Sequence, residues 1–460
     1  MSAFSQLNIK TDLQKNLKEL GFKALTPVQQ ASLPLILEGK DVIAQAKTGS
    51  GKTVAFGLGV LQHLDVRRFR IQSLILCPTR ELADQVAQEL RRLARLIHNI
   101  KVLTLCGGMP FGPQIGSLEH GAHIVVGTPG RIEEHLRKGT LTIDNVNMLV
   151  LDEADRMLDM GFQDTLDRIL DRLPAERQTL LFSATYPEQI QNIAKRVMKQ
   201  PEMIQIESEH DAQSIDQKFY RVANNSDREE LLARVLACYR PETSIVFCKT
   251  KRETDEVADY LKGCGYSALT LHGDMEQRAR TETLVRFANR SASVLVATDV
   301  AARGLDIASL DAVINFHIAL DPEVHTHRVG RTGRAGEKGM AFSFFSEKEV
   351  HRVLDLELKQ DPIANAEEWP GDHYADQPAF LPPMATLQID GGKKQKVRAG
   401  DILGALTNGD EIKGTDVGKI AIQDNSAYFA VKRNLAKTAL NKISKGKLKG
   451  RNFRVRLIRG

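Results

Sequence analysis

The chain has few cysteines, and their pattern excludes two common uses of this residue. Five cysteines occur in 460 residues, an odd number, and no two of them form a CxxC pair. This pattern predicts neither a disulfide framework nor a zinc site. Small buried side chains in a protein of the reducing cytosol are the better interpretation. The cysteines are Cys77, Cys106, Cys238, Cys248 and Cys264.

Long apolar runs are also absent. No run approaches the roughly 18 residues that cross a bilayer, and the first residues lack the apolar region of a signal peptide. The content of 42% hydrophobic and 26% charged residues is that of an ordinary globular chain, which excludes disordered and fibrous classes. At about 100–200 residues per domain, the length predicts about three domains.

Acidic residues are missing from the last part of the chain. Residues 431–460 hold 11 basic residues and no acidic one. Residues 385–460 hold 17 Lys and Arg against 6 Asp and Glu, a charge of +11, whereas residues 1–384 hold 46 against 52, a charge of −6. A basic segment attached to a mildly acidic body indicates an enzyme with a module that binds polyanions.

Short apolar runs alternate with amphipathic stretches in the first half of the chain. The runs Val42–Ala44, Leu74–Cys77, Ile124–Val126 and Met148–Leu151 are typical of strands buried on both faces of a parallel sheet. Between them, 80–96 repeats apolar residues at three- and four-residue spacing, as an amphipathic helix does. The alternation predicts a doubly wound α/β lobe.

The pattern repeats after a polar stretch and predicts a second α/β lobe. Its strands are expected at 244–248, 268–271, 294–298, 313–316 and 341–345. Residues 360–384 then hold five of the 16 prolines and the only tryptophan, which is typical of an extended linker. The predicted divisions are lobe one at 1–207, a linker at 208–217, lobe two at 218–358, a Pro-rich linker at 359–383 and a basic domain at 384–460.

The first predicted strand leads into a phosphate-binding motif. Residues 46–53 read Ala-Lys-Thr-Gly-Ser-Gly-Lys-Thr, a P-loop in which Ala46 replaces the usual first glycine. Glycines let backbone N–H groups turn toward phosphate, the lysine reaches the β- and γ-phosphates, and the final hydroxyl is a ligand for Mg²⁺. A chance glycine-rich turn is the alternative, which the flanking strand and helix disfavour. The motif predicts ATP and Mg²⁺ as cofactors, held by Thr48, Gly49, Gly51, Lys52 and Thr53.

An acidic pair follows a later strand. Asp152 and Glu153 end the apolar run at 148–151, about a hundred residues after the P-loop. Asp152 is predicted to hold Mg²⁺ through its waters, and Glu153 to orient or deprotonate the attacking water. Acidic residues at a strand end are otherwise mostly solvated loop residues, and the P-loop favours the catalytic interpretation.

The tetrapeptide Asp152-Glu153-Ala154-Asp155 resembles the motif that names the DEAD-box RNA helicases, and about ten motifs of that family occur in order across residues 4–334. The resemblance implies two tandem RecA-like lobes and an RNA-dependent ATPase. Residues 21–29 look like the Q motif, seventeen residues after Phe4, with Leu25 in place of the common proline. The resemblance then implies that Gln29 reads the adenine edge and that Phe22 packs on the ring.

Further motifs resemble the family's RNA-backbone motifs. Most of their residues are small, polar or backbone-presenting, so they are expected to contact phosphates and 2′-hydroxyls without reading sequence. The RNA contacts so implied are Pro78, Thr79, Arg80, Gly108, Thr128, Gly130, Arg131, Thr250, Arg280 and Thr298.

The remaining motifs concern hydrolysis and coupling. Arg331 and Arg334, in the motif at 327–334, fit the role of arginine fingers for the γ-phosphate, because the planar guanidinium binds phosphate oxygens in two places. The resemblance assigns Asp306 to the ribose. It assigns His327, Ser183 and Thr185 to coupling, and it implies that bound ATP closes the lobes on RNA.

The basic domain is predicted to have β-α-β-β-α-β order and a fold like the RNA-recognition motif. On its central strands only Tyr428 and Phe429 are aromatic, on opposite faces of one strand, so one or neither is a stacking platform. RNA binding is expected to depend on the Lys/Arg tail and on Lys393, Lys394, Lys396 and Arg398.

Residues 391–406 begin Gly-Gly-Lys-Lys and end Arg-Ala-Gly-Asp-Ile-Leu-Gly-Ala-Leu, and residues 324–328 read Val-His-Thr-His-Arg. With these two stretches, core and tail together resemble a bacterial subfamily of ribosomal-RNA helicases. The resemblance implies a 23S ribosomal-RNA hairpin and pre-50S particles as partners, with no membrane. One departure is His317, where the wider family often has an acid. Two alternatives stay open, namely an RNA clamp that uses ATP without unwinding and a DNA helicase of the wider superfamily.

Overall fold

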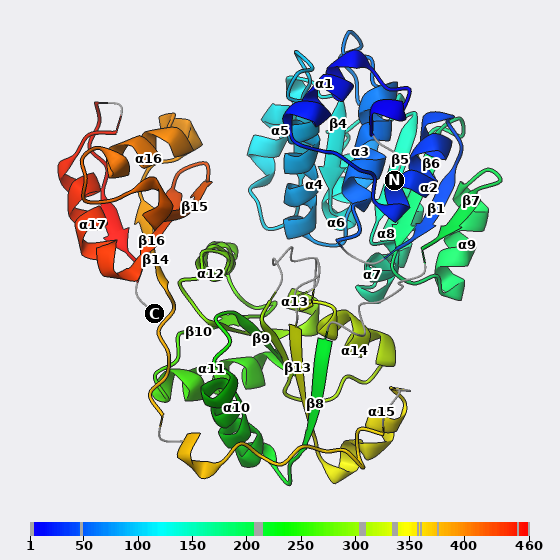
Figure 1. Cartoon of the computed structure of the whole chain (residues 1–460). Helices are drawn as coiled ribbons and strands as arrows, with labels where there is room; N and C mark the ends of the chain where they lie inside the picture. The colour runs from blue at the N-terminus through cyan, green and yellow to red at the C-terminus, as the bar shows by residue number, and fades with distance from the viewer. Residues whose placement is uncertain are drawn as a thin grey trace. The chain divides into compact units, whose positions relative to one another are not determined.

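The computed structural model describes residues 4–46, 49–206, 215–302, 310–333, 339–356, 358, 361–374, 377–448 and 450–458. The chain forms two compact units, one made by lobe one and the other by lobe two with the C-terminal domain. Three sheets lie within them, two entirely parallel and one antiparallel. The predicted fold class, two parallel-sheet lobes followed by a small α+β domain, is confirmed (Figure 1).

Lobe one is a seven-stranded parallel sheet in the order β3-β4-β2-β5-β6-β1-β7. Its strands are β1 (Val42–Gln45), β2 (Ser73–Leu76), β3 (Val102–Leu105), β4 (Ile124–Gly127), β5 (Met148–Asp152), β6 (Gln178–Ser183) and β7 (Glu202–Gln205). Its helices are α1 (Thr11–Glu19), α2 (Pro27–Leu37), α3 (Lys52–His63), α4 (Arg80–Leu93), α5 (Phe111–Glu119), α6 (Pro129–Arg137), α7 (Ala154–Asp159), α8 (Gln163–Leu170) and α9 (Glu188–Val197).

The apolar runs of lobe one are continuous because each strand supplies two cores. In β1, Val42 and Ala44 pack with α1–α4 on one face of the sheet, whereas Ile43 packs with α6–α9 on the other. In β5, Val150 packs in the core with α1–α4, and Leu149 packs in the core with α6–α9. Alternate side chains of a strand point to opposite faces, so a strand covered by helices on both sides needs no polar positions.

Lobe two repeats the parallel architecture with six strands in the order β10-β11-β9-β12-β13-β8. The strands are β8 (Ile215–Arg221), β9 (Ser244–Cys248), β10 (Ala268–Leu271), β11 (Val294–Thr298), β12 (Ala312–Asn315) and β13 (Gly339–Phe345). The helices are α10 (Asn225–Tyr239), α11 (Lys251–Gly263), α12 (Gln277–Ala288), α13 (Asp299–Ala302), α14 (Pro322–Val329) and α15 (Val350–Leu354). Strand β8 begins inside the stretch predicted as the first linker, because its backbone pairs with β13 along seven residues.

The Pro-rich stretch after lobe two packs against that lobe. The Trp369 indole N–H donates to the Arg221 carbonyl at 2.9 Å, and Lys218 pairs with Glu367 at 2.7 Å. The Phe380 ring meets the Tyr266 ring edge-on at 5.7 Å between centroids. The composition predicted an extended linker, and these contacts hold the described part of this stretch against lobe two.

The C-terminal domain has the predicted β-α-β-β-α-β order. Its antiparallel sheet runs β15-β16-β14-β17, and a hydrophobic core of its own lies between the sheet and two helices. The elements are β14 (Met384–Ile389), α16 (Ala399–Thr407), β15 (Val417–Ile422), β16 (Ala427–Lys432), α17 (Ala436–Lys445) and β17 (Val455–Leu457). Strand β16 ends at Lys432, and helix α17 begins at Ala436.

Two sequence-based exclusions can be compared with the structure. All five cysteines are free thiols, with three of them buried, which confirms the absence of a disulfide framework. Within the described ranges, no helix is both long enough and apolar enough to cross a membrane.

Candidate nucleotide and RNA site

The carboxyl edge of the lobe-one sheet collects the predicted motifs in a single row. In a parallel sheet all strands end at the same edge, and ligands bind in the loops beyond it. The loops after β3, β4 and β2 carry Gly108, Thr128 and Thr79, and these three strands are neighbours. The next three strands, β5, β6 and β1, lead to Asp152, Ser183 and the P-loop. RNA motifs and nucleotide motifs therefore lie side by side.

The P-loop backbone turns in a conformation that favours glycine. Gly49 has φ +84° and Gly51 has φ +94°, in the left-handed region, and α3 begins directly after Gly51. A Cβ at Gly51 would also lie 2.5 Å from the Gln29 amide nitrogen. Helix α3 therefore starts with its N-terminal N–H groups at the phosphate loop, where a helix favours anions. The Lys52 ammonium is buried and donates to the Ala46 carbonyl at 2.9 Å.

The Q-motif segment is tied to this loop. Gln29 is buried, its amide donates to the Gly51 carbonyl at 3.0 Å, and its oxygen accepts from the Thr26 N–H at 2.9 Å. Phe22 packs edge-on against Phe4 at 5.5 Å between centroids. The Arg92 guanidinium lies over the Phe22 ring, 5.3 Å from its centroid. The segment predicted to read adenine is thus part of the P-loop structure.

Asp152, at the end of β5, has one carboxylate oxygen without a hydrogen bond from the described residues. Its side chain is buried, and Oδ1 accepts no hydrogen bond from the part of the chain that the structure describes. Burial, assisted by the neighbouring Glu153 charge, raises the pKa of Asp152 to about 7 against the attraction of Lys52. A buried oxygen with unused lone pairs suits a hydrated cation such as Mg²⁺. No group of three His, Cys, Asp or Glu side chains able to hold a metal occurs among the described residues.

Glu153 is held in a strained backbone conformation. Its φ of +53° lies in the left-handed region, which is uncommon for residues other than glycine and costs about 1–3 kcal/mol. The side chain is buried and accepts from the Arg156 guanidinium at 3.0 Å. The strain and the buried ion pair fix the carboxylate beside Asp152, where the sequence predicted the catalytic pair.

Asp155 has a role in the structure that the sequence argument did not assign. One of its carboxylate oxygens accepts from the N–H groups of Ala184 and Thr185 at 3.1 and 3.0 Å, and from the Thr185 hydroxyl at 3.1 Å. The Asp155 N–H donates to the Ser183 hydroxyl at 3.3 Å. Burial alone would raise the pKa of Asp155, but the Thr185 N–H and the Arg156 charge outweigh it and lower that pKa. The two predicted coupling residues are thus bonded directly to the acidic motif.

Two predicted RNA-contacting arginines of lobe one meet at one loop. Arg80, from the start of α4, contacts the Met109 sulfur at 2.7 Å, and Arg131, from α6, donates to the Met109 carbonyl at 2.9 Å. Gly108, with φ +72°, precedes Met109, and the Thr128 hydroxyl accepts from the Gly107 N–H at 3.4 Å. Met109, which the sequence argument did not identify, joins the motifs after β2, β3 and β4. Pro78 lies in the loop after β2, next to Thr79, and Gly130 lies in the first turn of α6, next to Arg131.

Lobe two presents a comparable edge. Thr250 follows β9 and caps α11, its hydroxyl accepting from the Glu253 N–H at 3.1 Å. Thr298 ends β11, which pairs with β9, and Arg280 of α12 donates to the Ala301 carbonyl at 2.9 Å. The predicted RNA residues therefore again follow neighbouring strands.

The motif that contains the predicted arginine fingers follows β12. His327 lies on α14, and Arg331, just after this helix, is 5% exposed. Asp306 and Arg334, as well as Thr48 of the P-loop, lie outside the described residues.

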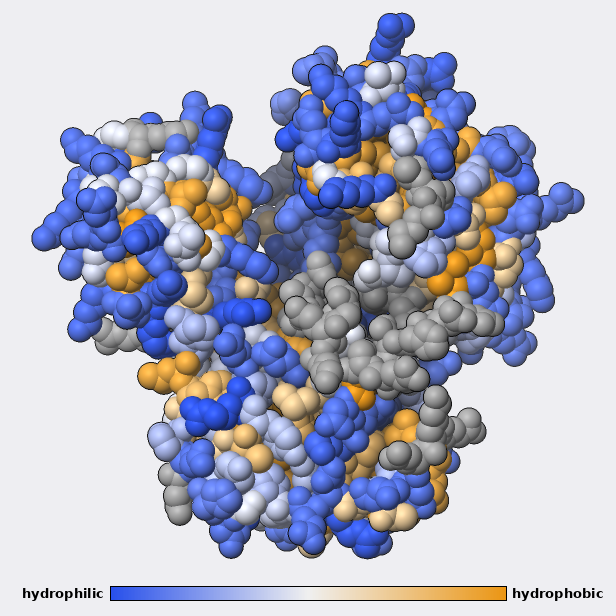
Figure 2. Space-filling model, in the orientation of Figure 1, coloured by the Kyte–Doolittle hydropathy of each residue, from blue (hydrophilic) through white to orange (hydrophobic). Residues whose placement is uncertain are grey.

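The C-terminal domain presents charge and no exposed aromatic platform among its described residues. Phe429 is fully buried in the domain core, and Tyr428, on the other face of the sheet, is 3% exposed. On that same face Thr386 accepts a hydrogen bond from Asn289 at 3.1 Å. Figure 2 shows a mainly hydrophilic surface on the viewer's side of this domain. The predicted basic residues Lys393, Lys394, Lys396 and Arg398 are all exposed.

Comparison with known proteins agrees with this arrangement. Family models match as DEAD/DEAH box helicase at residues 26–193, helicase conserved C-terminal domain at 227–336 and DbpA RNA binding domain at 386–457. ATP-dependent RNA helicase DbpA of Escherichia coli is 54% identical over 467 residues, covering 100% of both chains. DEAD-box ATP-dependent RNA helicase CshA of Geobacillus kaustophilus is 43% identical over 357 residues, which are 78% of this chain and 76% of the relative.

Among solved structures, Saccharomyces cerevisiae Dbp5 bound to RNA and ADP BeF3 superimposes with a TM-score of 0.71 and 30% identity, covering 77% of this chain and 92% of the Dbp5 chain. The full-length match to a helicase and the two helicase models identify the activity as ATP-dependent and directed at RNA. The chain belongs to the DEAD-box ATP-dependent RNA helicases, in the form that carries a C-terminal RNA-binding domain.

Proposed function

We propose that this helicase unwinds short RNA segments locally and is directed to 23S ribosomal RNA during large-subunit assembly in the cytoplasm. The observation that carries the local mechanism is the row of motifs along β3-β4-β2-β5-β6-β1, with RNA motifs beside nucleotide motifs. In such a row, a shift of the loops around ATP is passed to the RNA-contacting loops through bonded neighbours. The choice of ribosomal RNA is supported by the full-length similarity to DbpA of Escherichia coli and by the basic tail.

In the proposed mechanism, the P-loop amides and Lys52 bind the ATP phosphates, and Gln29 and Phe22 bind the adenine. Asp152 and the Thr53 hydroxyl would hold Mg²⁺, which neutralises phosphate charge when it is bound. Glu153, fixed by Arg156, orients the attacking water and takes its proton. Arg331 and Arg334 stabilise the charge that develops on the γ-phosphate.

Coupling in this proposal passes through Asp155. Because Asp155 bonds Thr185 directly, a change at Asp152 and Glu153 during hydrolysis is transmitted to the end of β6, the strand between the acidic motif and the P-loop. RNA binding and ATP binding then strengthen each other by the same factor, as linkage requires. The exposed Lys393, Lys394, Lys396 and Arg398 bind phosphates whether or not ATP is present.

The test is ATPase stimulation by a panel of RNA fragments, with a duplex-release assay run beside it. The full chain and a chain ending at residue 383 are compared on a 23S fragment and on unrelated RNA of equal length. We expect the full chain to prefer the 23S fragment and the shortened chain to keep weak, unselective stimulation. Equal stimulation by DNA would contradict RNA specificity, and stimulation without strand release would indicate a clamp.

A further inference from the structure

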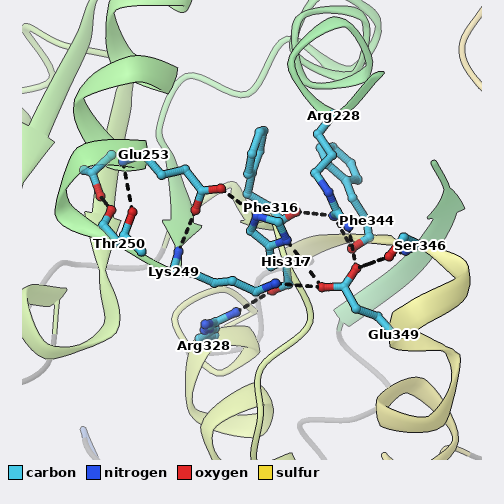
Figure 3. Close-up of polar contacts among 11 residues, drawn as sticks. Arg228, Lys249, Thr250, Glu253, Phe316, His317, Arg328, Phe344, Ser346 and Glu349 are labelled. Carbon is cyan, nitrogen blue, oxygen red and sulfur yellow. Dashed lines mark hydrogen bonds and ion pairs between the residues drawn. The ribbon is translucent and has the colours of Figure 1, made fainter. Parts of the chain in front are cut away.

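A histidine of lobe two, His317, lies between two carboxylates (Figure 3). Its Nε2 is 2.7 Å from Glu253 Oε1, and its Nδ1 is 3.3 Å from Glu349 Oε1. Glu253 comes from α11 and Glu349 from the short turn Glu347–Glu349 after β13, so the ring bridges elements far apart in sequence. The histidine side chain is 6% exposed, and its partners are 16% and 5% exposed.

His317 joins the two carboxylates through its two ring nitrogens. Burial would raise the pKa of each carboxyl, but the hydrogen bonds to His317 and the nearby cations outweigh it, so the pKa of Glu253 and that of Glu349 both lie below their ordinary values. Ionised carboxylates only accept hydrogen bonds, so a side chain that joins both must offer a donor to each.

The two carboxylates hold the segment that leads into the predicted RNA contact. Glu253 Oε2 accepts from the Lys249 backbone N–H at 2.8 Å, and Glu349 Oε1 accepts from the Lys249 ammonium at 3.2 Å. Lys249 is thus held at both its backbone and its side chain, immediately before Thr250. The Thr250 hydroxyl in turn caps α11 through the Glu253 N–H. The position of Thr250 depends on carboxylates that His317 joins.

Other charged groups surround the same cluster. Arg228 of α10 is bonded to Glu349 and to the Phe316 carbonyl, and Ser346 donates to Glu349 twice at 3.0 Å. Arg328 of α14 donates to the His317 carbonyl at 2.8 Å and pairs with Asp299 at 2.6 and 2.7 Å.

We propose that His317 is a positioning residue that, by joining Glu253 and Glu349, fixes Lys249 and Thr250 for RNA binding. The inference rests on the proposed contact between Thr250 and RNA. When one of the two bonds is lost, a buried carboxylate is left without its donor. Glu253 or Glu349 then shifts, and the segment at 249–250 is less well placed for a phosphate oxygen.

The test uses the full chain and measures ATPase at saturating ATP and Mg²⁺ against the concentration of a single-stranded RNA. For His317→Gln we expect the RNA concentration for half-maximal stimulation to rise about fivefold, with a smaller change in maximal rate, because an amide cannot donate to both carboxylates.

A compensating variant separates positioning from simple structural support. In Glu253→Gln the amide oxygen still accepts from the Lys249 N–H, while the amide NH₂ can donate to the imidazole Nε2. We therefore expect this variant to bind RNA nearly as well as the wild type. His373→Gln, at an exposed position of the stretch along lobe two, should keep the wild-type RNA dependence.

Two outcomes would overturn the proposal. One is a wild-type RNA dependence in His317→Gln, and the other is a Glu253→Gln variant that binds RNA as weakly as His317→Gln. If RNA stimulates no hydrolysis in the wild type, the proposed function itself has failed. If the wild type is stimulated but His317→Gln keeps its RNA dependence, only the role of His317 is lost.

Discussion

Lobe one leaves a buried carboxylate oxygen of Asp152 without a hydrogen bond from any described residue, while lobe two surrounds Glu349 with donors. Asp152 is the last residue of the parallel strand β5, and Glu349 follows the parallel strand β13. They differ in how many hydrogen bonds their carboxylate oxygens accept. Burial has raised the pKa of Asp152 to about 7, whereas its neighbours hold the pKa of Glu349 well below its usual range.

This contrast distinguishes a ligand site from a scaffold. A buried oxygen without a partner costs free energy, and a protein retains such an oxygen where a ligand supplies what is missing. A carboxylate that accepts from four side chains and a backbone N–H has no capacity left for a ligand, so it fixes its neighbours instead. In the proposed function, Asp152 therefore serves a bound ligand, and Glu349 serves the positions of its neighbours.

The largest expected effect concerns the catalytic pair of lobe one. Glu153→Gln should lower RNA-stimulated ATP turnover about 10²–10⁴-fold, because the amide cannot take a proton from water. Steady-state ATPase rates at saturating RNA measure this change. The matched control is Glu176→Gln, an exposed glutamate of the same lobe, which should keep the wild-type rate. Turnover near wild type in Glu153→Gln would remove the general-base assignment.

The next effect concerns the saturated carboxylate of lobe two. Glu349→Ala should lower the free energy of unfolding by about 3–5 kcal/mol, because Arg228 is left buried without its partner. Urea unfolding followed by tryptophan fluorescence reports on this lobe, since Trp369 is the only tryptophan and is bonded to Arg221. Glu347→Gln, two residues away in an exposed pair with Arg221, should cost less than about 1 kcal/mol. Equal losses of unfolding free energy in Glu349→Ala and Glu347→Gln would contradict the structural role given to Glu349.

The pH dependence of the two carboxylates should have opposite signs. Asp152 keeps its proton up to about pH 7 in the folded chain but releases it near 3.8 when unfolded, so its contribution to stability falls as pH rises between these values. Glu349 has a lowered pKa, so its contribution is present above its ordinary value of 4.5 and is lost as pH falls below it.

The stability of Asp152→Asn, measured without added nucleotide, tests the pH dependence expected for Asp152. The variant should gain about 1–3 kcal/mol of stability relative to wild type on going from pH 5 to pH 8, because it has no proton to lose. Hydrogen exchange of the β5 amides at the two pH values reports the local stability. Wild-type and variant values that change in parallel with pH would show that Asp152 ionises normally.

The smallest expected effect extends the comparison to the C-terminal domain. Replacing Lys393 and Lys394 by Ala should weaken RNA binding a few-fold and reduce the slope of log K against log salt by about 1 for each lost phosphate contact. RNA titrations at several salt concentrations, without ATP, measure the slope. Lys15→Ala, at an exposed lysine of lobe one, should leave it unchanged. An unchanged slope in the double variant would move the phosphate contacts elsewhere in the tail.

Much of the fold could be predicted because its signals are local. The runs that became β9, β10 and β11 were predicted with the observed bounds, since buried strands of a doubly wound sheet are continuously apolar. Strand β8 was taken in part for a linker because its residues are mostly polar, and its strand character comes from pairing with β13.

The sequence by itself determined the motifs, their order, the two lobes and the division of charge between body and tail, because each is a property of residues near one another in the chain. Only the tertiary structure decided that Asp152 has an unused oxygen, that Asp155 bonds Thr185, and that Arg80 and Arg131 meet at Met109. It also placed His317 between Glu253 and Glu349, 64 and 32 residues away. Hydrogen-bond saturation depends on which distant residues meet in the folded chain, and motif spacing does not specify such meetings.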